Sequence, residues 1–335
     1  MLALRKLLFP LSLLYGLVIV VRHFLYDKGI FRSVSHPIPV ISIGNLSFGG
    51  TGKTPMTEYI VQQLQNDYFT AILSRGYKRT SKGFYLADRN TSAEILGDEP
   101  YQYHQKFPKI YIAVDSDRNR GVRHLMTLPN PPDIIVLDDA FQHRKIAPGL
   151  NILLTTYANM YVDDLLFPAG NLRDAKRQAK RADSIVITKC PPQLSEREKL
   201  NIKARIHPKP HQEVFFTSIA YDTTLKSADG TLTLEALTTA PFTLVTGIAN
   251  PKPLVDFLKE KNLDFEHLKY PDHHKFSGRE IAVLRQKKRI VTTEKDYARL
   301  QHKIPKAYYL PIRPVFLEKE AVFNALLQHY IARYT

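Results

Sequence analysis

Residues 42–55, SIGNLSFGGTGKTP, carry the clearest chemical signal of the chain. They follow a short apolar stretch, Pro39-Val40-Ile41, and precede a helical pattern, Met56 to Leu64. In a glycine-rich turn between a strand and a helix, successive backbone N–H groups and the positive end of the helix converge on an anion. The spacing predicts that Lys53 reaches the outer phosphates of a nucleotide and that the Thr54 hydroxyl binds magnesium.

This segment departs at one position from the phosphate-binding pattern G-x-x-x-x-G-K-[ST], because Ser47 stands where the pattern has its first glycine. A glycine-rich turn without a ligand is the alternative. The strand before it, the helix after it and the sequence GGTGKT within it favour the nucleotide-binding interpretation. We therefore expect the phosphates to be surrounded by Gly49, Gly50, Thr51, Gly52, Lys53 and Thr54.

Residues 133–139, DIIVLDD, form an apolar stretch that ends in two carboxylates, Asp138 and Asp139. In P-loop proteins an acid at the end of such a strand holds magnesium or its water beside the P-loop threonine. Paired acids in this place also occur as plain helix caps. The P-loop upstream favours the metal interpretation, and Gln142 and His143 can add polar contacts to the nucleotide or to the metal shell.

Two polar loops can supply an acid–base pair. In Gly97-Asp98-Glu99-Pro100, Asp98 either caps the following helix or acts as the general base that deprotonates an acceptor hydroxyl in line with a γ-phosphate. Pro271-Asp272-His273-His274 lies between apolar stretches. It is either a surface loop or, if it faces a cleft between domains, the partner of a carboxylate base.

Two further loops present arginines. Residues 74–77, SRGY, follow the apolar stretch 70–73 and so lie at the edge of the predicted sheet, and residues 168–173, PAGNLR, present Asn171 and Arg173. Arginines at such positions can clamp phosphate oxygens and stabilise charge in a transition state. Taken singly, each arginine is more typical of an ordinary surface residue.

The elements that must position these loops alternate between short apolar runs and helical stretches. Several runs are apolar throughout, as expected for strands covered on both faces in a parallel sheet. The alternation predicts a doubly wound α/β fold of the P-loop type, with chemistry at the carboxyl ends of the strands. The predicted strands are 40–43, 70–73, 110–114, 134–137, 151–155 and 184–188, and the predicted helices are 54–65, 100–106, 118–126 and 196–206.

The pattern changes near residues 207–240. Residues 215–221 and 231–234 are predicted to be strands, with a turn at 228–230, and a second α/β cycle follows, with strands at 242–246, 289–293 and 307–310 and helices at 253–261 and 318–333. We expect four parts in the chain: an N-terminal anchor helix (1–30), a P-loop kinase domain (31–214), a two-stranded connection (215–235) and a smaller C-terminal α/β domain (236–335).

The N-terminal segment has a run of 15 residues without a charge, Leu7 to Val21, flanked by Arg5, Lys6 and Arg22. A membrane-spanning helix usually needs about 20 apolar residues. No small-x-small cleavage site follows the run, which argues against a signal peptide. We expect an uncleaved membrane anchor that either spans the bilayer or lies deep in one leaflet; an amphipathic core helix is the alternative.

Charge and cysteine content narrow the function further. The 335 residues contain 47 Lys and Arg against 32 Asp and Glu, a formal net charge of +15. This excess favours an anionic partner such as nucleic acid, an anionic membrane or a phosphorylated substrate. No nucleic-acid-binding signature accompanies the basic residues, so we expect no nucleic acid partner. The single cysteine, Cys190, excludes an intrachain disulfide and fits a reducing compartment.

In combination and order, these motifs resemble those of the tetraacyldisaccharide 4′-kinases of lipid A biosynthesis. The resemblance covers nearly the whole chain, through the apolar N-terminus, GN-x3-GGTGKTP, SRGY, GDEP, DDAFQH, PAGNLR, the GIA-x-P loop, PDHH and TEKD. Members of this family usually have serine at the position of Ser47. Ala140 is a departure, because the family usually has glycine in DDG-x-QH.

The resemblance implies a reaction: ATP donates its γ-phosphoryl group, with Mg²⁺, to the 4′-hydroxyl of a tetraacylated disaccharide 1-phosphate, giving lipid IVA. It also implies a place, the cytoplasmic side of the bacterial inner membrane with its anionic lipids, and no obligate protein partner is evident. It further implies roles for the site residues. Lys53 and the GGTGKT backbone bind the phosphates, Thr54, Asp138 and Asp139 hold magnesium, and Asp98 is the base, assisted by His273. Gln142 and His143 lie near the nucleotide, and the residues near nucleotide or substrate are Tyr77, Glu99, Arg118, Asn171 and Arg173.

Two other classes stay open at this point. One is a membrane-bound nucleotide switch, although Thr188-Lys189-Cys190-Pro191 lacks the aspartate that follows the base-reading lysine of some GTPases. The other is a nucleic-acid-associated ATPase, which only the positive charge suggests.

Overall fold

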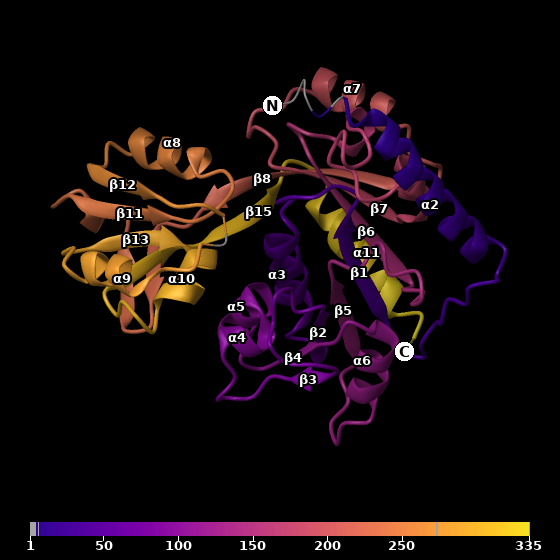
Figure 1. Ribbon diagram of the computed structural model, residues 1–335, viewed down its shortest axis with the longest axis horizontal. Helices are drawn as coiled ribbons and strands as arrows, with labels where there is room; N and C mark the ends of the chain where they lie inside the picture. The colour runs from indigo at the N-terminus through magenta and orange to yellow at the C-terminus, as the bar shows by residue number, and fades with distance from the viewer. Residues whose placement is uncertain (1–4, 6, 273, 335) are drawn as a thin grey trace.

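The computed structural model describes residues 5, 7–272 and 274–334. Within these residues it contains two β-sheets, each with its own helices (Figure 1). We call the part built on the nine-stranded sheet the larger lobe and the part built on the six-stranded sheet the smaller lobe. The strands of the larger lobe are β1 (Val40–Asn45), β2 (Thr70–Ser74), β3 (Tyr85–Leu86), β4 (Tyr111–Val114), β5 (Ile134–Asp138), β6 (Leu150–Thr156), β7 (Ser184–Thr188), β8 (Glu213–Tyr221) and β15 (Ile312–Phe316).

The larger sheet has the order β15-β8-β7-β6-β1-β5-β2-β4-β3. Every pair from β8 to β4 is parallel, and β15 and β3 add antiparallel strands at the two edges. β1 lies between β6 and β5, and all of its residues are buried. The continuous apolar runs of the sequence therefore form the interior strands, which are covered on both faces.

Helices cover both faces of this sheet. Met56 and Ile60 of one helix pack with Phe323 of another against one face, whereas Val122 and Leu125 of a third pack with the opposite face of the same strands. This is the arrangement of a doubly wound fold, as the sequence predicted. The helices of the larger lobe are α3 (Lys53–Leu64), α4 (Ala93–Leu96), α5 (Asp98–Lys106), α6 (Arg118–Met126), α7 (Glu196–Ile206) and α11 (Glu320–Ile331), with 3₁₀ turns at Tyr161–Asp163 and Lys176–Arg181.

The smaller lobe is built on a sheet of the order β10-β9-β14-β13-β11-β12. The four strands from β14 to β12 are parallel, and β9 and β10 form an antiparallel edge. Its elements are β9 (Thr224–Ser227), β10 (Gly230–Thr233), a 3₁₀ turn at Glu235–Leu237, β11 (Phe242–Thr246), α8 (Lys252–Glu260), β12 (Phe265–Lys269), α9 (Gly278–Arg285), β13 (Ile290–Thr293), α10 (Glu294–Leu300) and β14 (Ala307–Leu310).

The connection between the lobes differs from the predicted one. The sequence suggested a pair of strands at 215–221 and 231–234, but β8 belongs to the larger sheet, and β10 pairs with β9 in the smaller sheet. Two strands do join the lobes: β8 leads to the smaller lobe and β15 returns from it, paired with β8 (Figure 1).

The end of the chain also lies elsewhere than expected. The sequence analysis expected no strand between the strand 307–310 and the helix 318–333 of the C-terminal part. Residues Ile312–Phe316 form β15 at the edge of the larger sheet, and α11 then packs in the larger lobe through Phe323 and Leu327. The chain thus leaves the larger lobe once and comes back to it. The predicted division into domains stays a prediction.

The apolar N-terminal run forms α2 (Phe9–Asp27), whose best window has a mean hydropathy of 1.6 and is 17% buried. Its buried residues, Ser12, Gly16, Ile19 and His23, form one stripe at helical spacing against the larger lobe (Figure 1). The opposite sides expose large apolar residues, including Leu13, Leu14, Leu17, Val18 and Val21. An amphipathic core helix usually exposes polar side chains on its outer face, so the exposed apolar residues of α2 favour the anchor.

Candidate active site

The P-loop connects the end of β1 to the start of α3. Gly49 has a φ of 106° and Gly52 a φ of 85°, a backbone conformation that side chains with a Cβ rarely adopt. Because α3 begins at Lys53, the first N–H groups of the helix have no partner within it and face the loop. Loop and helix end thus form the expected anion-binding turn.

Side chains from neighbouring strands fix the shape of this loop. The Asn45 amide donates to the Thr51 hydroxyl over 2.7 Å, and the Thr188 hydroxyl donates to the Thr51 carbonyl over 2.8 Å. The Lys189 ammonium donates to the Gly50 carbonyl over 2.7 Å. Lys189, which the sequence placed where some GTPases read a base, therefore contacts the backbone of the P-loop.

The two acids of residues 133–139 lie in different surroundings at the end of β5. Asp139 adopts a φ of 48° and accepts from the Arg173 guanidinium, while the Lys53 ammonium lies 3.7 Å from one of its oxygens. Burial acts to raise the pKa of Asp139, but Lys53 and Arg173 outweigh it and lower the pKa to about 2. Asp139 is therefore a carboxylate at neutral pH.

Asp138 is buried, and burial raises its pKa, as do the nearby carboxylates of Glu99 and Asp139. One of its oxygens accepts from the Ser74 hydroxyl over 3.3 Å, and the other has no hydrogen-bond partner among the described residues. A buried carboxylate oxygen without a partner, close to other carboxylates, fits a divalent cation.

No group of three acidic, histidine or cysteine side chains with metal-binding geometry occurs among the described residues. A P-loop magnesium site needs only one or two protein ligands, which act together with phosphate oxygens and water. Thr54 lies in the first turn of α3, next to Lys53, whose ammonium lies 3.7 Å from Asp139.

The residues after the acids support the P-loop from the side. The Gln142 amide donates to the Asn45 carbonyl over 2.6 Å. Burial, and next the charges of Arg118 and Arg75, lower the pKa of His143 to about 4, so this imidazole is neutral at pH 7. Arg118 is itself buried and donates to the Asp115 and Asp138 carbonyls, which places it behind the end of β5.

The loops 74–77 and 97–100 lie against each other. Gly97 has a φ of 93°, and a Cβ there would come within 2.8 Å of the Tyr77 carbonyl oxygen. Tyr77 is exposed at this junction, and the charge of Glu99 contributes to the raised pKa of Asp138.

Asp98 pairs with Arg299 of α10, which reaches across from the smaller lobe with N–O distances of 2.8 and 2.9 Å. The third nitrogen of Arg299 donates to Asp296 over 3.1 Å. His273, the predicted assistant of Asp98, lies outside the described residues. The loop that carries it is close to α10, since the carboxylate of its neighbour Asp272 lies 3.7 Å from the Lys295 ammonium.

The structure thus brings Lys53, Asp138, Asp139 and Arg173 together at the P-loop and places Asp98 where the lobes meet. Two residues that the sequence analysis did not select also belong here. Asn45 contacts Thr51 and Arg173 and accepts from Gln142; the glycine–asparagine pair in the family motif was its only signal. Arg299 follows the TEKD motif by three residues and had no signal of its own.

Fold and site define the class of the protein: a P-loop nucleotide-binding enzyme arranged for phosphoryl transfer. A family profile described as tetraacyldisaccharide-1-P 4′-kinase matches residues 4–332, and the chain belongs to this family.

Individual relatives agree with the family. The chain is 46% identical over 333 residues to a tetraacyldisaccharide 4′-kinase of Flavobacterium johnsoniae, covering 98% of this chain and 97% of that one. A protein of the same name from Flavobacterium psychrophilum is 47% identical over 335 residues, again with 98% and 97% covered. The structure is similar to the "apo" form of LpxK from Aquifex aeolicus in complex with ATP, with a TM-score of 0.81, 30% identity, and 98% and 99% of the two chains covered.

Proposed function

We propose that this protein transfers the γ-phosphoryl group of ATP to the 4′-hydroxyl of a tetraacyldisaccharide 1-phosphate and so produces the bis-phosphorylated precursor of lipid A. The observation that carries the proposal is the cluster of Lys53, Asp138, Asp139 and Arg173 at the P-loop of a chain that belongs to the 4′-kinase family. The structural relative that contains ATP supports the choice of nucleotide.

The proposed roles follow from position. The P-loop amides and Lys53 bind the phosphates, Thr54 and Asp138 hold Mg²⁺, and Arg173 neutralises charge on the transferred group. The bound cation would supply charge neutralisation between the phosphates. Arg173 is engaged with Asp139 and Asn45, so it already lies at the edge of the phosphate site.

Asp98 is the proposed base for the 4′-hydroxyl, with His273 as its assistant. Asp98 begins α5, directly before Glu99, whose charge acts on Asp138, and the pair with Arg299 holds its carboxylate at the junction of the two lobes. A phosphotransferase needs a carboxylate there to orient the acceptor hydroxyl in line with the γ-phosphate.

We further propose that α2 lies within one leaflet of the bacterial inner membrane, with the catalytic lobes on the cytoplasmic side. Contacts with the larger lobe run along the helix from Ser12 to Asp27, so lipid cannot surround it on all sides. Its opposite face is apolar, as in helices that lie in the membrane interface. The net charge of +15 adds attraction to anionic lipids.

The direct test is phosphoryl transfer by purified protein in mixed micelles, with labelled ATP, Mg²⁺ and the disaccharide lipid. We expect label on the lipid with the wild type and none above background with Lys53→Ala. Lys252→Ala, which changes an exposed lysine of the smaller lobe, is the control and keeps wild-type activity. Label found only as free phosphate would contradict the kinase and favour a slow ATPase or switch.

A further inference from the structure

The anchor helix α2 makes several polar contacts with one loop of the larger lobe, the segment 164–174 that contains PAGNLR. The Ser12 hydroxyl donates to the Leu166 carbonyl and accepts from the Ala169 amide, both over 2.9 Å. The Tyr15 hydroxyl donates to the carbonyl of Arg173 over 3.0 Å. These polar contacts from an otherwise apolar helix fix the path of the loop.

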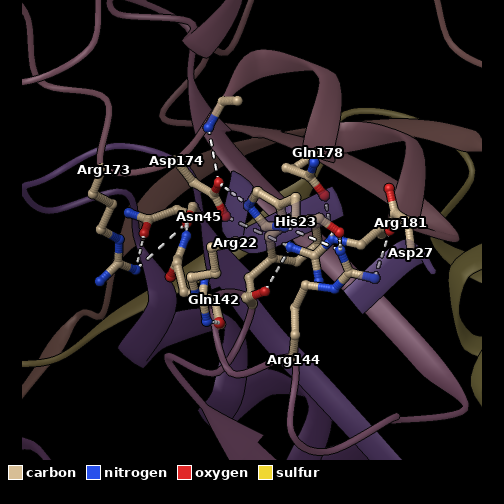
Figure 2. Close-up of polar contacts among 12 residues, drawn as sticks. Arg22, His23, Asp27, Asn45, Gln142, Arg144, Arg173, Asp174, Gln178 and Arg181 are labelled. Atoms are coloured by element: carbon tan, nitrogen blue, oxygen red, sulfur yellow. Dashed lines mark hydrogen bonds and ion pairs between the residues drawn. The ribbon is translucent and has the colours of Figure 1, made fainter. Parts of the chain in front are cut away.

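The strongest contact is buried. His23 of α2 is 0% exposed and Asp174 is 1% exposed, and His23 Nε2 lies 2.6 Å from Asp174 Oδ1 (Figure 2). The other ring nitrogen, Nδ1, lies 3.1 Å from a guanidinium nitrogen of Arg144. A guanidinium can only donate, so Nδ1 accepts and the proton that Asp174 receives is on Nε2. Each polar atom of the imidazole therefore has one defined partner.

The loop held by α2 is also joined to the P-loop. The Phe48 amide donates to the Asn171 carbonyl over 2.7 Å, and the Arg173 amide donates to the Leu46 carbonyl over 2.8 Å. The Phe167 ring lies between Tyr15 of α2 and Phe48 of the P-loop, with edge contacts at 6.2 and 5.7 Å between ring centroids. Backbone and rings together link helix, loop and P-loop.

Arg173 lies where the loop 164–174 reaches the phosphate site. It directly precedes Asp174, its carbonyl accepts from Tyr15, and its guanidinium binds Asp139. The guanidinium also donates to Asn45 (Figure 2). The buried, hydrogen-bonded Asp174 that follows this arginine, its own carbonyl bonded to Tyr15 and its amide bonded to Leu46 leave its backbone little freedom. Its guanidinium is thereby fixed before a phosphate arrives, which lowers the cost of ordering it during the reaction.

We propose that His23 is a positioning residue for phosphoryl transfer: through Asp174 it fixes Arg173 at the nucleotide site, so that α2 is a structural part of the active site as well as a membrane anchor. The inference rests on the role proposed above for Arg173. A residue needed for catalysis then lies in the helix that also contacts the lipid. Activity therefore depends on how α2 packs against the larger lobe.

The test compares two substitutions of His23 in the full-length protein. His23→Leu has similar size but no donor, whereas His23→Gln keeps a donor and an acceptor at the end of a similar side chain. We expect His23→Leu to lower kcat roughly ten- to hundredfold with little change in the KM for ATP, and His23→Gln to restore most of the rate. His267→Leu, which removes a histidine hydrogen bond in the smaller lobe, is the matched control.

Two measurements separate positioning from tethering and from unfolding. Flotation with vesicles of phosphatidylethanolamine and phosphatidylglycerol should show equal binding of wild type and His23→Leu, because the exposed face of α2 is unchanged; a parallel loss of binding and rate would overturn the proposal. If thermal melting shows that His23→Leu does not fold, Tyr15→Phe replaces it, since this change removes only the hydroxyl that holds Arg173.

A double-mutant cycle identifies the route. If His23 acts through Arg173, then adding His23→Leu to Arg173→Ala lowers kcat no further; additive losses, or a folded His23→Leu protein with kcat within twofold of wild type, overturn the proposal. If the wild type transfers no phosphate to lipid, the proposed function fails. The same four proteins then report the coupling through their rates of ATP hydrolysis.

Discussion

At the scale of single residues, Asp98 is the group whose replacement tests the proposed chemistry most directly. Asp98→Asn keeps the shape of the side chain but cannot take a proton from the acceptor hydroxyl. We expect kcat to fall by about two to four orders of magnitude, with the KM for ATP unchanged, in steady-state assays of phosphoryl transfer. Asp67→Asn, at an exposed turn after α3, is the control. Near-normal turnover of Asp98→Asn would reject the role.

His143 gives a second prediction, on the pH dependence of stability. Its pKa is about 4 in the folded protein, below its ordinary 6.5, so between these values the unfolded chain binds a proton that the folded protein excludes. Stability is therefore lost as pH falls from about 6.5 towards 4. His143→Gln does not titrate and should lose less unfolding free energy than wild type between pH 7 and 5, measured by urea denaturation.

The control for this measurement is His329→Gln, at an exposed position of α11, which should keep the wild-type pH dependence. If His143→Gln and wild type lost the same free energy of unfolding over this range, His143 would not be the buried neutral group that the structure describes.

Residue types and spacing predicted the part of the site that lies on consecutive motifs, such as Lys53 and the two acids at the end of β5. They did not predict Asn45 or Arg299. Asparagine at the end of a strand is common, and the role of Asn45 depends on contacts with three residues from different segments of the chain. Arg299 meets Asp98 across 201 positions of sequence, a contact that no local pattern encodes.

At the scale of elements, the junction of β1 with the loop after β5 depends on a glycine. A Cβ at Gly44 would lie 2.6 Å from the Phe141 Cβ and 2.8 Å from the Phe141 amide nitrogen. One is a main-chain atom and the other is the first carbon of the side chain, so neither can move without shifting the backbone of Phe141. Gly44→Ala should therefore cost about 1–3 kcal/mol of unfolding free energy in urea denaturation.

Gly278→Ala is the matched control for this prediction. A Cβ at Gly278 meets nothing within 4 Å, and the residue begins α9, where alanine is a better helix former than glycine. We expect it to be neutral or slightly stabilising. Equal effects of the two substitutions would show that the contact with Phe141 is not what excludes a side chain from Gly44.

Elements with a continuous apolar run were predicted with nearly the observed bounds; β7, β11, β14 and α6 agree at both ends. The missed elements are short, polar or at sheet edges. β15 contains Pro314 and reads as a loop, but it is an edge strand, where a missing N–H is tolerated. β12, FEHLK, is likewise an edge strand whose charged residues hide its pattern.

At the scale of the whole molecule, two lobes joined by β8 and β15 meet again between α5 and α10. Ala298 of α10 packs with Leu96 and Tyr101 of the larger lobe, and Tyr101 also hydrogen-bonds His302 over 2.9 Å. The contact brings Arg299 to Asp98, so the proposed base is completed only when the lobes are together. The P-loop and Asp98 both belong to the larger lobe, but Arg299 of the smaller lobe holds Asp98, so we expect transfer to depend on this contact.

A buried ion cluster within the same contact predicts how the contact responds to pH. The Lys106 ammonium lies 2.6 Å from Glu58 and 3.0 Å from Glu294 of α10, so one cation serves two carboxylates. Burial, and next the charge of Glu294, raise the pKa of Glu58 to about 7 against the opposing effect of Lys106. The folded protein therefore keeps a proton that the unfolded chain releases near pH 4.5.

The stabilisation linked to this proton is fully present below about pH 4.5 and is lost as pH rises to about 7. Glu58→Gln is neutral at every pH and still accepts a hydrogen bond from Lys106. It should therefore lose less unfolding free energy than wild type between pH 5 and 8 in urea denaturation, whereas Glu260→Gln, at the exposed end of α8, should follow the wild type. Parallel curves for wild type and Glu58→Gln would mean that the proton is not held at this contact, and the two lobes would then meet without regard to pH.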